Sequence, residues 1–411
     1  MTAYAGRPLR VLIIVENLPL PFDRRVWQEA NALRGAGCRV SIISPMGRGY
    51  EQPYEEINDI AIYRHPLPGE GDSASGYLRE YTTALWWEFK LSLRVLRERG
   101  FDVIQACNPP DSIFLIGLFY KLLLGKHFVF DHHDLNPELY LAKFMKKDLF
   151  YNLMLLLERL TFKAADFSIA TNESYRRIAI ERGGMSPERV KVVRSGPSLE
   201  RLRIVPPDPR WKNGRRFLVG YLGVMGKQEG LDHLLRAAHE LVFSQGREDV
   251  QFVLVGDGTE LGAIRRMCRE LGLEDHVTFT GRVPDSDVLE ILCTADVCVN
   301  SDVANEMNDK STMNKVMEYM ALGRPIVQYD LTEGRFSARE ASLYARPNDV
   351  RDLAAKIAYL LDHPDQRERM GRMGRKRVQE ELHWGVEEPK YLGLYRKMAA
   401  RVAGCVPLQA P

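Results

Sequence analysis

Residues 308–327 of this 411-residue chain combine side chains that suit a phosphate group and a sugar hydroxyl. Ser311 and Thr312 stand where a helix is predicted to begin, and that helix then carries Lys315 and Glu318. The start of a helix exposes unpaired N–H groups and a partial positive charge, so hydroxyls and an ammonium would complete a phosphate site. Glu318, about one turn further on, could accept hydrogen bonds from ribose hydroxyls. The plainer interpretation is an N-cap followed by a solvated charge.

A second polar cluster, residues 130–138, follows a predicted strand in the first half of the chain. It places His132 and His133 between two aspartates, the second of which is Asp134. An isolated histidine is usually structural, but two histidines on one strand-end loop favour a functional role.

The loop after the first predicted strand offers a third candidate, Asp23 with Arg24 and Arg25. Asp23 could simply cap the helix that follows. The arginines could instead hold an anionic acceptor, such as a lipid phosphate or a sugar phosphate, through charge-assisted hydrogen bonds.

Short β-branched runs alternate with longer amphipathic segments along the whole chain, which predicts βα units and parallel sheets. In such sheets ligands bind beyond the carboxyl ends of the strands, where all three candidate loops would lie. The predicted strands cover residues 11–15, 40–44, 103–106, 127–131, 167–170 and 190–193, then 217–223, 252–256, 277–281, 297–300 and 325–329.

Three prolines and flanking charge at residues 206–214 predict an interdomain linker. We therefore expect a first domain of residues 1–205, to which a C-terminal helix of about residues 386–411 returns, and a second domain of residues 206–385.

Composition excludes several classes of protein. The formal net charge of +2 lacks the basic footprint of a nucleic-acid binder, so no nucleic acid is expected as a partner. Six cysteines without CxxC spacing argue against structural zinc and disulfides. The acidic triplet 285–287 follows Pro284 at a predicted helix start, where carboxylates favour the helix dipole, so we predict no metal and no cofactor.

Hydrophobic patterning predicts a cytoplasmic protein. The apolar run 9–15 is too short for a secretory signal, and the run 113–124 falls short of a membrane span and predicts a buried helix. Residues 77–99 and 144–159 set basic side chains beside large apolar ones, which suits a helix lying peripherally on the inner membrane face. Core packing explains these apolar residues equally well.

Four segments in the second half together resemble the family-4 retaining glycosyltransferases of the GT-B fold. They are GYLGVMGKQEGLDHLLRAA (220–238), VLVGDGTELGAIR (253–265), VTFTGRVPDSDV (277–288) and MEYMALGRPIV (317–327), in the family's order. The resemblance implies two Rossmann-like domains facing a cleft and metal-independent transfer of sugar from a nucleotide diphosphate sugar, usually UDP-linked. The acceptor would be a hydroxyl on a lipid-linked sugar, a glycan or a small molecule, and the anomeric configuration would be retained.

The resemblance also assigns roles to individual residues. Glu318 would hold the donor ribose, and the backbone at Arg282 and Val283 would lie beside the base. In the first domain, His133 with Asp134 matches the element beside the reacting sugar, which leaves His132 as a structural neighbour.

The donor loop departs from the family's pattern. The family's sugar-contacting glutamate is replaced by Lys310, its arginine after the strand-end glycine, here Gly223, by Val224, and a later lysine by Glu229.

A leaving diphosphate still needs positive charge, so we expect Lys227 and Lys315 to supply it, or Lys310 from across the site. The alternative for Lys227 and Lys315 is that both are ordinary surface charges. The alternatives for the protein are a UDP-sugar 2-epimerase and a non-catalytic homologue that binds nucleotide without turnover.

Overall fold

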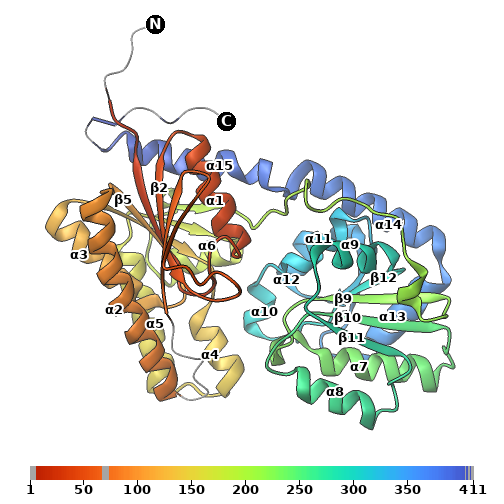
Figure 1. The fold of residues 1–411 in the computed structure, drawn as a ribbon. Coiled ribbons are helices and arrows are strands. Elements are labelled where there is room, and N and C mark those ends of the chain that lie inside the picture. Colours follow the sequence, from red (N-terminus) through yellow and green to blue (C-terminus); the bar gives the residue numbers. More distant parts are fainter. Residues whose placement is uncertain (1–5, 67–73, 403, 406–407, 409–411) are drawn as a thin grey trace, which may run out of the picture. The chain divides into compact units, whose positions relative to one another are not determined.

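A computed structural model of the chain describes residues 6–66, 74–402, 404, 405 and 408. It divides into two compact units, unit 1 formed by Met1–Ser195 with Glu387–Pro411 and unit 2 formed by Gly196–Val386. Each unit is a layered α/β fold built on a largely parallel sheet (Figure 1). The expected pair of Rossmann-like folds, with a C-terminal helix rejoining the first, is therefore confirmed.

The sheet of unit 1 has the strand order β3-β4-β2-β1-β5-β6-β7-β8, and only the β3–β4 pair is antiparallel. Its strands are β1 (Arg10–Ile14), β2 (Arg39–Pro45), β3 (Tyr54–Ile57), β4 (Ile60–His65), β5 (Val103–Cys107), β6 (His127–His132), β7 (Phe167–Ala170) and β8 (Val190–Val192). Its helices are α1 (Arg24–Gly35), α2 (Ala74–Glu98), α3 (Phe114–Leu124), α4 (Asn136–Phe144), α5 (Leu149–Ala164), α6 (Glu173–Glu181) and most of α15 (Trp384–Ala399). The hairpin strands β3 and β4 were not predicted, because β3 is short and polar.

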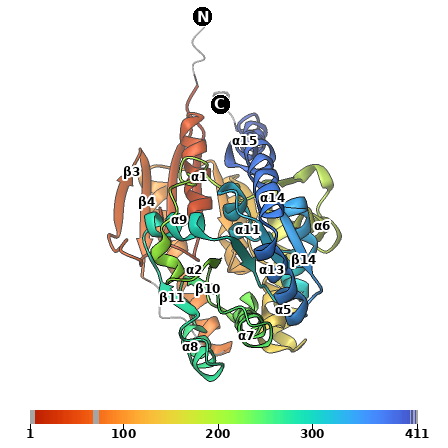
Figure 2. The ribbon, with the colours of Figure 1, turned by 90° about the vertical axis from the view of Figure 1, so that its right-hand side faces the viewer.

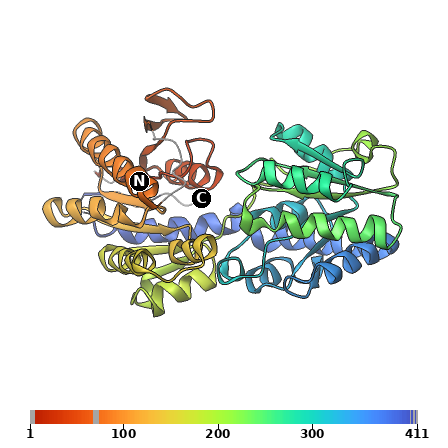
Figure 3. The ribbon, with the colours of Figure 1, turned by 90° about the horizontal axis from the view of Figure 1, so that it is seen from below.

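Helices enclose this sheet on both faces. α1 and α15 cover one face, where Gln105 of β5 bonds both Glu29 of α1 and Tyr391 of α15 (Figure 2). α2, α3 and α5 lie side by side on the other face (Figure 3), and the rings of Phe89 in α2 and Phe119 in α3 pack with centroids 5.0 Å apart. The return of the chain through α15 thus becomes part of the unit 1 core.

The sheet of unit 2 is parallel throughout, in the order β11-β10-β9-β12-β13-β14. Its strands are β9 (Phe217–Leu222), β10 (Val250–Val255), β11 (Val277–Gly281), β12 (Val297–Asn300), β13 (Ile326–Tyr329) and β14 (Ser342–Ala345). Its helices are α7 (Leu231–His239), α8 (Leu261–Glu270), α9 (Asp285–Thr294), α10 (Glu306–Lys310), α11 (Asn314–Ala321), α12 (Thr332–Ala338), α13 (Val350–Asp362) and α14 (Pro364–Arg377). The four-residue edge strand β14 was not predicted.

The boundary after Ser195 lies earlier than the expected position after residue 205. Leu199 and Leu202 pack against the apolar core of unit 2, and the backbone N–H of Val205 donates to Cys293 Sγ at 3.5 Å. The expected linker, residues 206–214, therefore lies within unit 2.

The expectation that residues 113–124 form a buried helix is wrong for the outer side of α3. Leu122 and Leu123 are 73% and 65% exposed, because only one side of α3 packs on the sheet. Within the described residues, no helix is both long and apolar enough to cross a membrane.

Candidate active site

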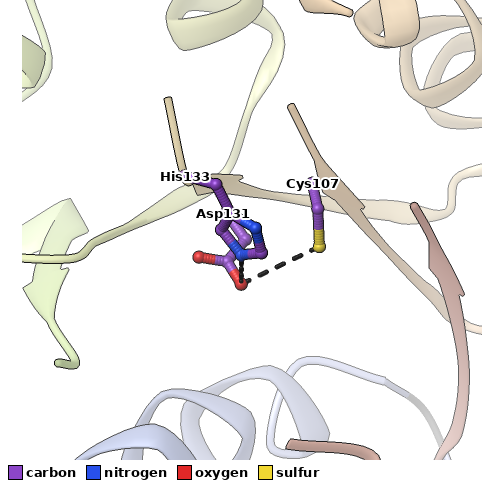
Figure 4. A group of neighbouring side chains, drawn as sticks. All are labelled: Cys107, Asp131 and His133. Carbon is purple, nitrogen blue, oxygen red and sulfur yellow. Dashed lines mark hydrogen bonds and ion pairs between the residues drawn. The ribbon is translucent and has the colours of Figure 1, made fainter. Parts of the chain in front are cut away.

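The carboxyl end of β6 presents the first candidate group, Asp131 and His133 (Figure 4). His133 Nε2 lies 2.9 Å from Oδ2 of the fully buried Asp131. Burial lowers the pKa of His133, but the charge of Asp131 and its hydrogen bond outweigh that effect, so the pKa is raised overall. His133 is thus held in place and biased toward its charged form.

Arg25 of α1 anchors the other side of this pair. Its Nη2 lies 3.0 Å from Asp131 Oδ1 and 3.2 Å from Glu29 Oε1, and its Nε lies 3.1 Å from His133 Nε2. Arg25 and Glu29 share one side of α1 because they are four residues apart. Since the guanidinium is already bound to two buried carboxylates, Arg25 serves to position Asp131.

The neighbours of Arg25 point elsewhere. Asp23 Oδ1 accepts the backbone N–H of Val26 at 3.1 Å, which confirms the helix-capping alternative for Asp23. Arg24 is exposed at the first position of α1.

The two buried carboxylates differ in protonation. Burial and the charge of Asp131 raise the pKa of Glu29 to about 8. Burial would also raise the pKa of Asp131, but the charges of Arg25 and His133 lower it overall. Gln105 donates to both, at 2.7 Å to Glu29 and 3.1 Å to Asp131. Near neutral pH, Glu29 therefore holds a proton, and Asp131 is the ionised carboxylate beside the guanidinium of Arg25.

Cys107, Asp131 and His133 bring a sulfur, an oxygen and a nitrogen within 4.8 Å of one another (Figure 4), a spacing that a metal ion could use. Arg25 already neutralises Asp131, however, and burial raises the pKa of the Cys107 thiol, which disfavours the thiolate that a metal needs. The electrostatics favour the internal network over a cation.

Asn108 fixes the loop that carries His133. Its Oδ1 accepts the backbone N–H of His133 at 2.7 Å and of Asp134 at 3.2 Å, and its Nδ2 donates to the Asp134 carbonyl at 2.7 Å. His132 turns inward against Phe162, and burial lowers its pKa to about 3. His132 is therefore a neutral core residue, as expected.

Unit 2 presents the second candidate group at the carboxyl ends of β9 and β10. Gly256 has φ +137°, and a Cβ there would meet the carbonyl oxygen of Gly223 at 1.8 Å. Only glycine permits this approach of the two strand-end loops. Gly223 thus lies in a closely packed backbone edge.

Lys315 lies in the first turn of α11 but is almost buried, with 9% of its side chain exposed. Its Nζ contacts Glu229 and lies 2.9 Å from Asp302 Oδ1. Burial raises the pKa of Asp302 to about 7, whereas Lys315 lowers that of Glu229 against the effect of burial. The ammonium of Lys315, expected to bind a diphosphate, is therefore already paired with Glu229, which stands where the family has a lysine.

Glu318, one turn further along α11, bonds Arg201, whose Nη1 also lies 3.6 Å from Asp285 Oδ2. Met313, the N-cap residue of α11, makes no side-chain hydrogen bond to the first turn of this helix. The start of α11 is not plugged by its own cap, while Glu318 has an arginine partner that any ribose would have to share or displace.

The remaining predicted residues of unit 2 surround this edge. Lys310 bonds Glu306 at 2.6 Å, and Ser311 Oγ donates to the Met307 carbonyl at 2.8 Å, so both are tied to α10. Lys227 is exposed and begins the short 3-10 turn η4 (Lys227–Glu229). Three predicted residues remain. Thr312 precedes α11, Arg282 is exposed directly after β11, and Val283 packs on the core of unit 2.

The acidic triplet has the structural place expected for it. Asp285 and Asp287 lie in the first turn of α9, directly after Pro284. Carboxylates there favour the helix dipole.

Residues 23–196 match the family described as glycosyl transferase 4-like domain, and residues 216–363 match glycosyl transferases group 1. The chain belongs to the family-4 glycosyltransferases of the GT-B fold. It is therefore a glycosyltransferase, and the predicted enzyme class is confirmed.

The similarity of the chain to individual relatives is low in sequence. The 2-deoxystreptamine glucosyltransferase of Streptomyces kanamyceticus is 29% identical over 152 residues, which span 36% of this chain and 37% of that protein. Sucrose-phosphate synthase of Thermosynechococcus elongatus has a TM-score of 0.77 at 18% identity, covering 96% of this chain and 100% of the other. Anabaena HepE, in complex with UDP and glucose, has a TM-score of 0.71 at 15% identity, covering 94% and 99%. The likeness to these solved structures establishes the fold.

Sequence reasoning missed several residues of this glycosyltransferase. Glu29 and Asp131 complete the His133 network, and the spacing of Arg25 and Glu29 by four residues on a predicted helix was the available signal. Arg201 fell in a segment that resembled nothing, and only the fold brings it to Glu318.

Proposed function

We propose that this glycosyltransferase moves a sugar from a UDP-sugar to a hydroxyl acceptor, without a metal and with retention of anomeric configuration. One observation carries the proposal. Glu318 lies one turn inside α11, whose uncapped start shares the carboxyl edge of the unit 2 sheet with the Gly223 loop. Helix N–H groups suit a pyrophosphate, and a carboxylate one turn along suits a ribose. The solved relative that holds UDP and glucose supports uridine as the base.

Diphosphate departure needs nearby positive charge. In this proposal Lys227 supplies it from the turn η4, and Lys315 supplies it after exchanging Glu229 for phosphate. Ser311 and Thr312 add hydroxyl donors at the start of α11.

The family resemblance supports retention. In this proposal Asp131 holds His133 through the 2.9 Å contact at Nε2, so that the imidazole can bind a donor-sugar hydroxyl. The leaving diphosphate itself would then help to deprotonate the acceptor.

The test is binding followed by product analysis. We expect UDP and UDP-sugars to raise the melting temperature, since a ligand at 100 times its Kd contributes about 2.7 kcal/mol. With a turnover-competent acceptor, the anomeric proton coupling in NMR should report the donor's configuration in the product. Failure of every nucleotide to stabilise the protein would contradict the proposal.

Glu318→Gln should weaken UDP binding at least tenfold, or about 1.4 kcal/mol, because a neutral amide is a poorer acceptor for ribose hydroxyls. Glu270→Gln, at an exposed position of α8, is the matched control and should bind as the parent does. Unchanged affinity in Glu318→Gln would remove Glu318 from the donor site.

The same assays separate the alternatives. Epimerised product from UDP-GlcNAc without acceptor would identify a UDP-sugar 2-epimerase. Nucleotide binding without turnover across donors and acceptors would identify a non-catalytic homologue, for which the Lys315–Glu229 ion pair is the specific motive.

A further inference from the structure

One face of unit 1 exposes an unusual amount of apolar surface. α2, α3 and α5 form a single layer on the sheet (Figure 3), with α3 packed against both neighbours. Each helix turns large side chains outward, including Trp86 in α2 at 57% exposure, Leu122 in α3 at 73% and Leu149 in α5 at 82%. We call this layer the outer face. It consists of α2 from residue 82 onward, α3, α5 and the short turn between α4 and α5.

The outward apolar residues follow helical spacing. In α5 they are Leu149, Leu153 and Leu156, which lie on one side of the helix because they are four and then three residues apart. Of 18 exposed large hydrophobic residues that the structure describes, 11 lie between Trp86 and Leu156. Scattered apolar residues are normal on any surface, but a cluster of this kind marks an interaction surface.

Cations border this apolar surface. Exposed lysines and arginines on or next to the three helices are Lys90, Arg94, Arg97, Lys143, Lys146, Lys147, Arg159 and Lys163. α3 contains no acidic residue, and Glu158 of α5 is buried against Arg182. Of the other acids, exposed Glu98 of α2 pairs with Arg94, and Asp148 caps α5. The exposed lysines and arginines outnumber these acids, so the outer face is net positive.

A groove of about 530 Å³ lies beside α2. It is lined by Trp87, Leu91 and Leu93 with the cations Arg94 and Arg97, and by residues outside α2 that include Met46, Pro53 and Pro66. An apolar floor with a cationic rim fits a phosphate headgroup above an acyl chain.

We propose that the outer face docks on the surface of an anionic lipid bilayer. Leucine and tryptophan would enter the headgroup boundary while the surrounding lysines and arginines contact lipid phosphates. A second copy of this chain is a poorer occupant, because two such faces would place like charges opposite each other. The sheet face and the donor-site residues take no part, so docking does not depend on the proposed transfer reaction.

The experiment is cosedimentation of the full chain with vesicles, without nucleotide. We expect binding to phosphatidylcholine vesicles containing 30–40% phosphatidylglycerol, and much weaker binding to pure phosphatidylcholine. Raising salt from about 0.1 M to 1 M should weaken binding as screening increases. Equal binding to both vesicle types, or none to either, would overturn the proposal.

Two variants locate the surface. Leu122→Gln/Leu153→Gln removes exposed apolar side chains, and Lys146→Ser/Lys147→Ser removes exposed cations; each should weaken vesicle binding roughly tenfold or more. The matched controls in unit 2 are Phe243→Gln and Lys376→Ser, both exposed, which should bind as the parent does. Melting temperatures and UDP binding should stay unchanged in all four variants, which separates failure of docking from failure of the donor site. A dimer in light scattering that the leucine variant dissolves would instead assign the face to a second copy.

Discussion

Both units bury one cation between two carboxylates, but they use this arrangement in opposite ways. In unit 1, Arg25 neutralises Asp131 so that Asp131 can hold His133, the residue expected to meet substrate. In unit 2, Lys315 is itself the residue expected to meet substrate, and Glu229 already occupies its ammonium. Arg25 supports Asp131, so His133 is already in place to bind substrate. Lys315 must instead exchange Glu229 for the substrate before it can act.

The comparison predicts opposite signs for the removal of an anion. Loss of the anion in unit 1 should damage both stability and the site, because His133 and Arg25 both depend on Asp131. Loss of Glu229 in unit 2 should release a charge for the ligand. Three predictions test this contrast.

Asp131→Asn should lower the free energy of unfolding by about 3–5 kcal/mol, because it leaves Arg25 buried with Glu29 as its one carboxylate partner. Urea unfolding at pH 7 measures the change. The pKa of His133, followed by NMR, should fall because the charge that raises it is gone.

Asp59→Asn is the control for this variant, since that carboxylate is 88% exposed and should contribute little. A stability loss below 1 kcal/mol in Asp131→Asn would show that Arg25 is not held by this ion pair.

The sequence predicted the architecture better than the ion pairs. Apolar runs were enough for central strands such as β1 and β10, because parallel strands are apolar throughout, but not for β4, which is fully buried and was not predicted. Edge strands such as β3 are short and polar, so periodicity missed them.

Site residues were predictable where local chemistry decides and not where long-range contacts do. His133 follows a strand, and Asp23 precedes a helix, so both could be placed from their neighbours in the chain. The partner of Lys315 is Glu229, 86 positions away, and that of Glu318 is Arg201, 117 positions away. Nothing local in the sequence specifies such pairs.

Glu229→Gln should tighten UDP binding by about 1 kcal/mol, roughly fivefold, because Lys315 then exchanges one carboxylate fewer for phosphate. Isothermal titration of UDP measures the effect. Glu248→Gln, at an exposed position of unit 2, should leave the affinity unchanged. Weaker binding in Glu229→Gln would mean that Glu229 orients Lys315 toward the ligand, which would bring unit 2 into line with unit 1.

The last prediction concerns the proton on Glu29. Its pKa is about 8 in the folded chain against an ordinary value of 4.5, so between these pH values the folded protein holds a proton that the unfolded chain releases. The resulting stabilisation is complete below pH 4.5 and is lost as pH rises through about 8. This carboxyl alone should therefore lower the free energy of unfolding between pH 5 and 8, by less than the limit for one proton of about 1.4 kcal/mol per pH unit. Asp111 and Asp302, whose pKa values are raised to about 7, add to the fall in the same range.

Glu29→Gln should flatten this fall, because an amide does not titrate and still accepts a hydrogen bond from Gln105. Glu51→Gln, at an exposed position of unit 1, should keep the slope of the parent protein. Denaturant unfolding at several pH values gives all three slopes. If Glu29→Gln and the parent share one slope, the proton is not on Glu29, and the unit 1 network would be two ionised carboxylates around Arg25, unlike unit 2, where burial raises the pKa of Asp302 beside Lys315 to about 7.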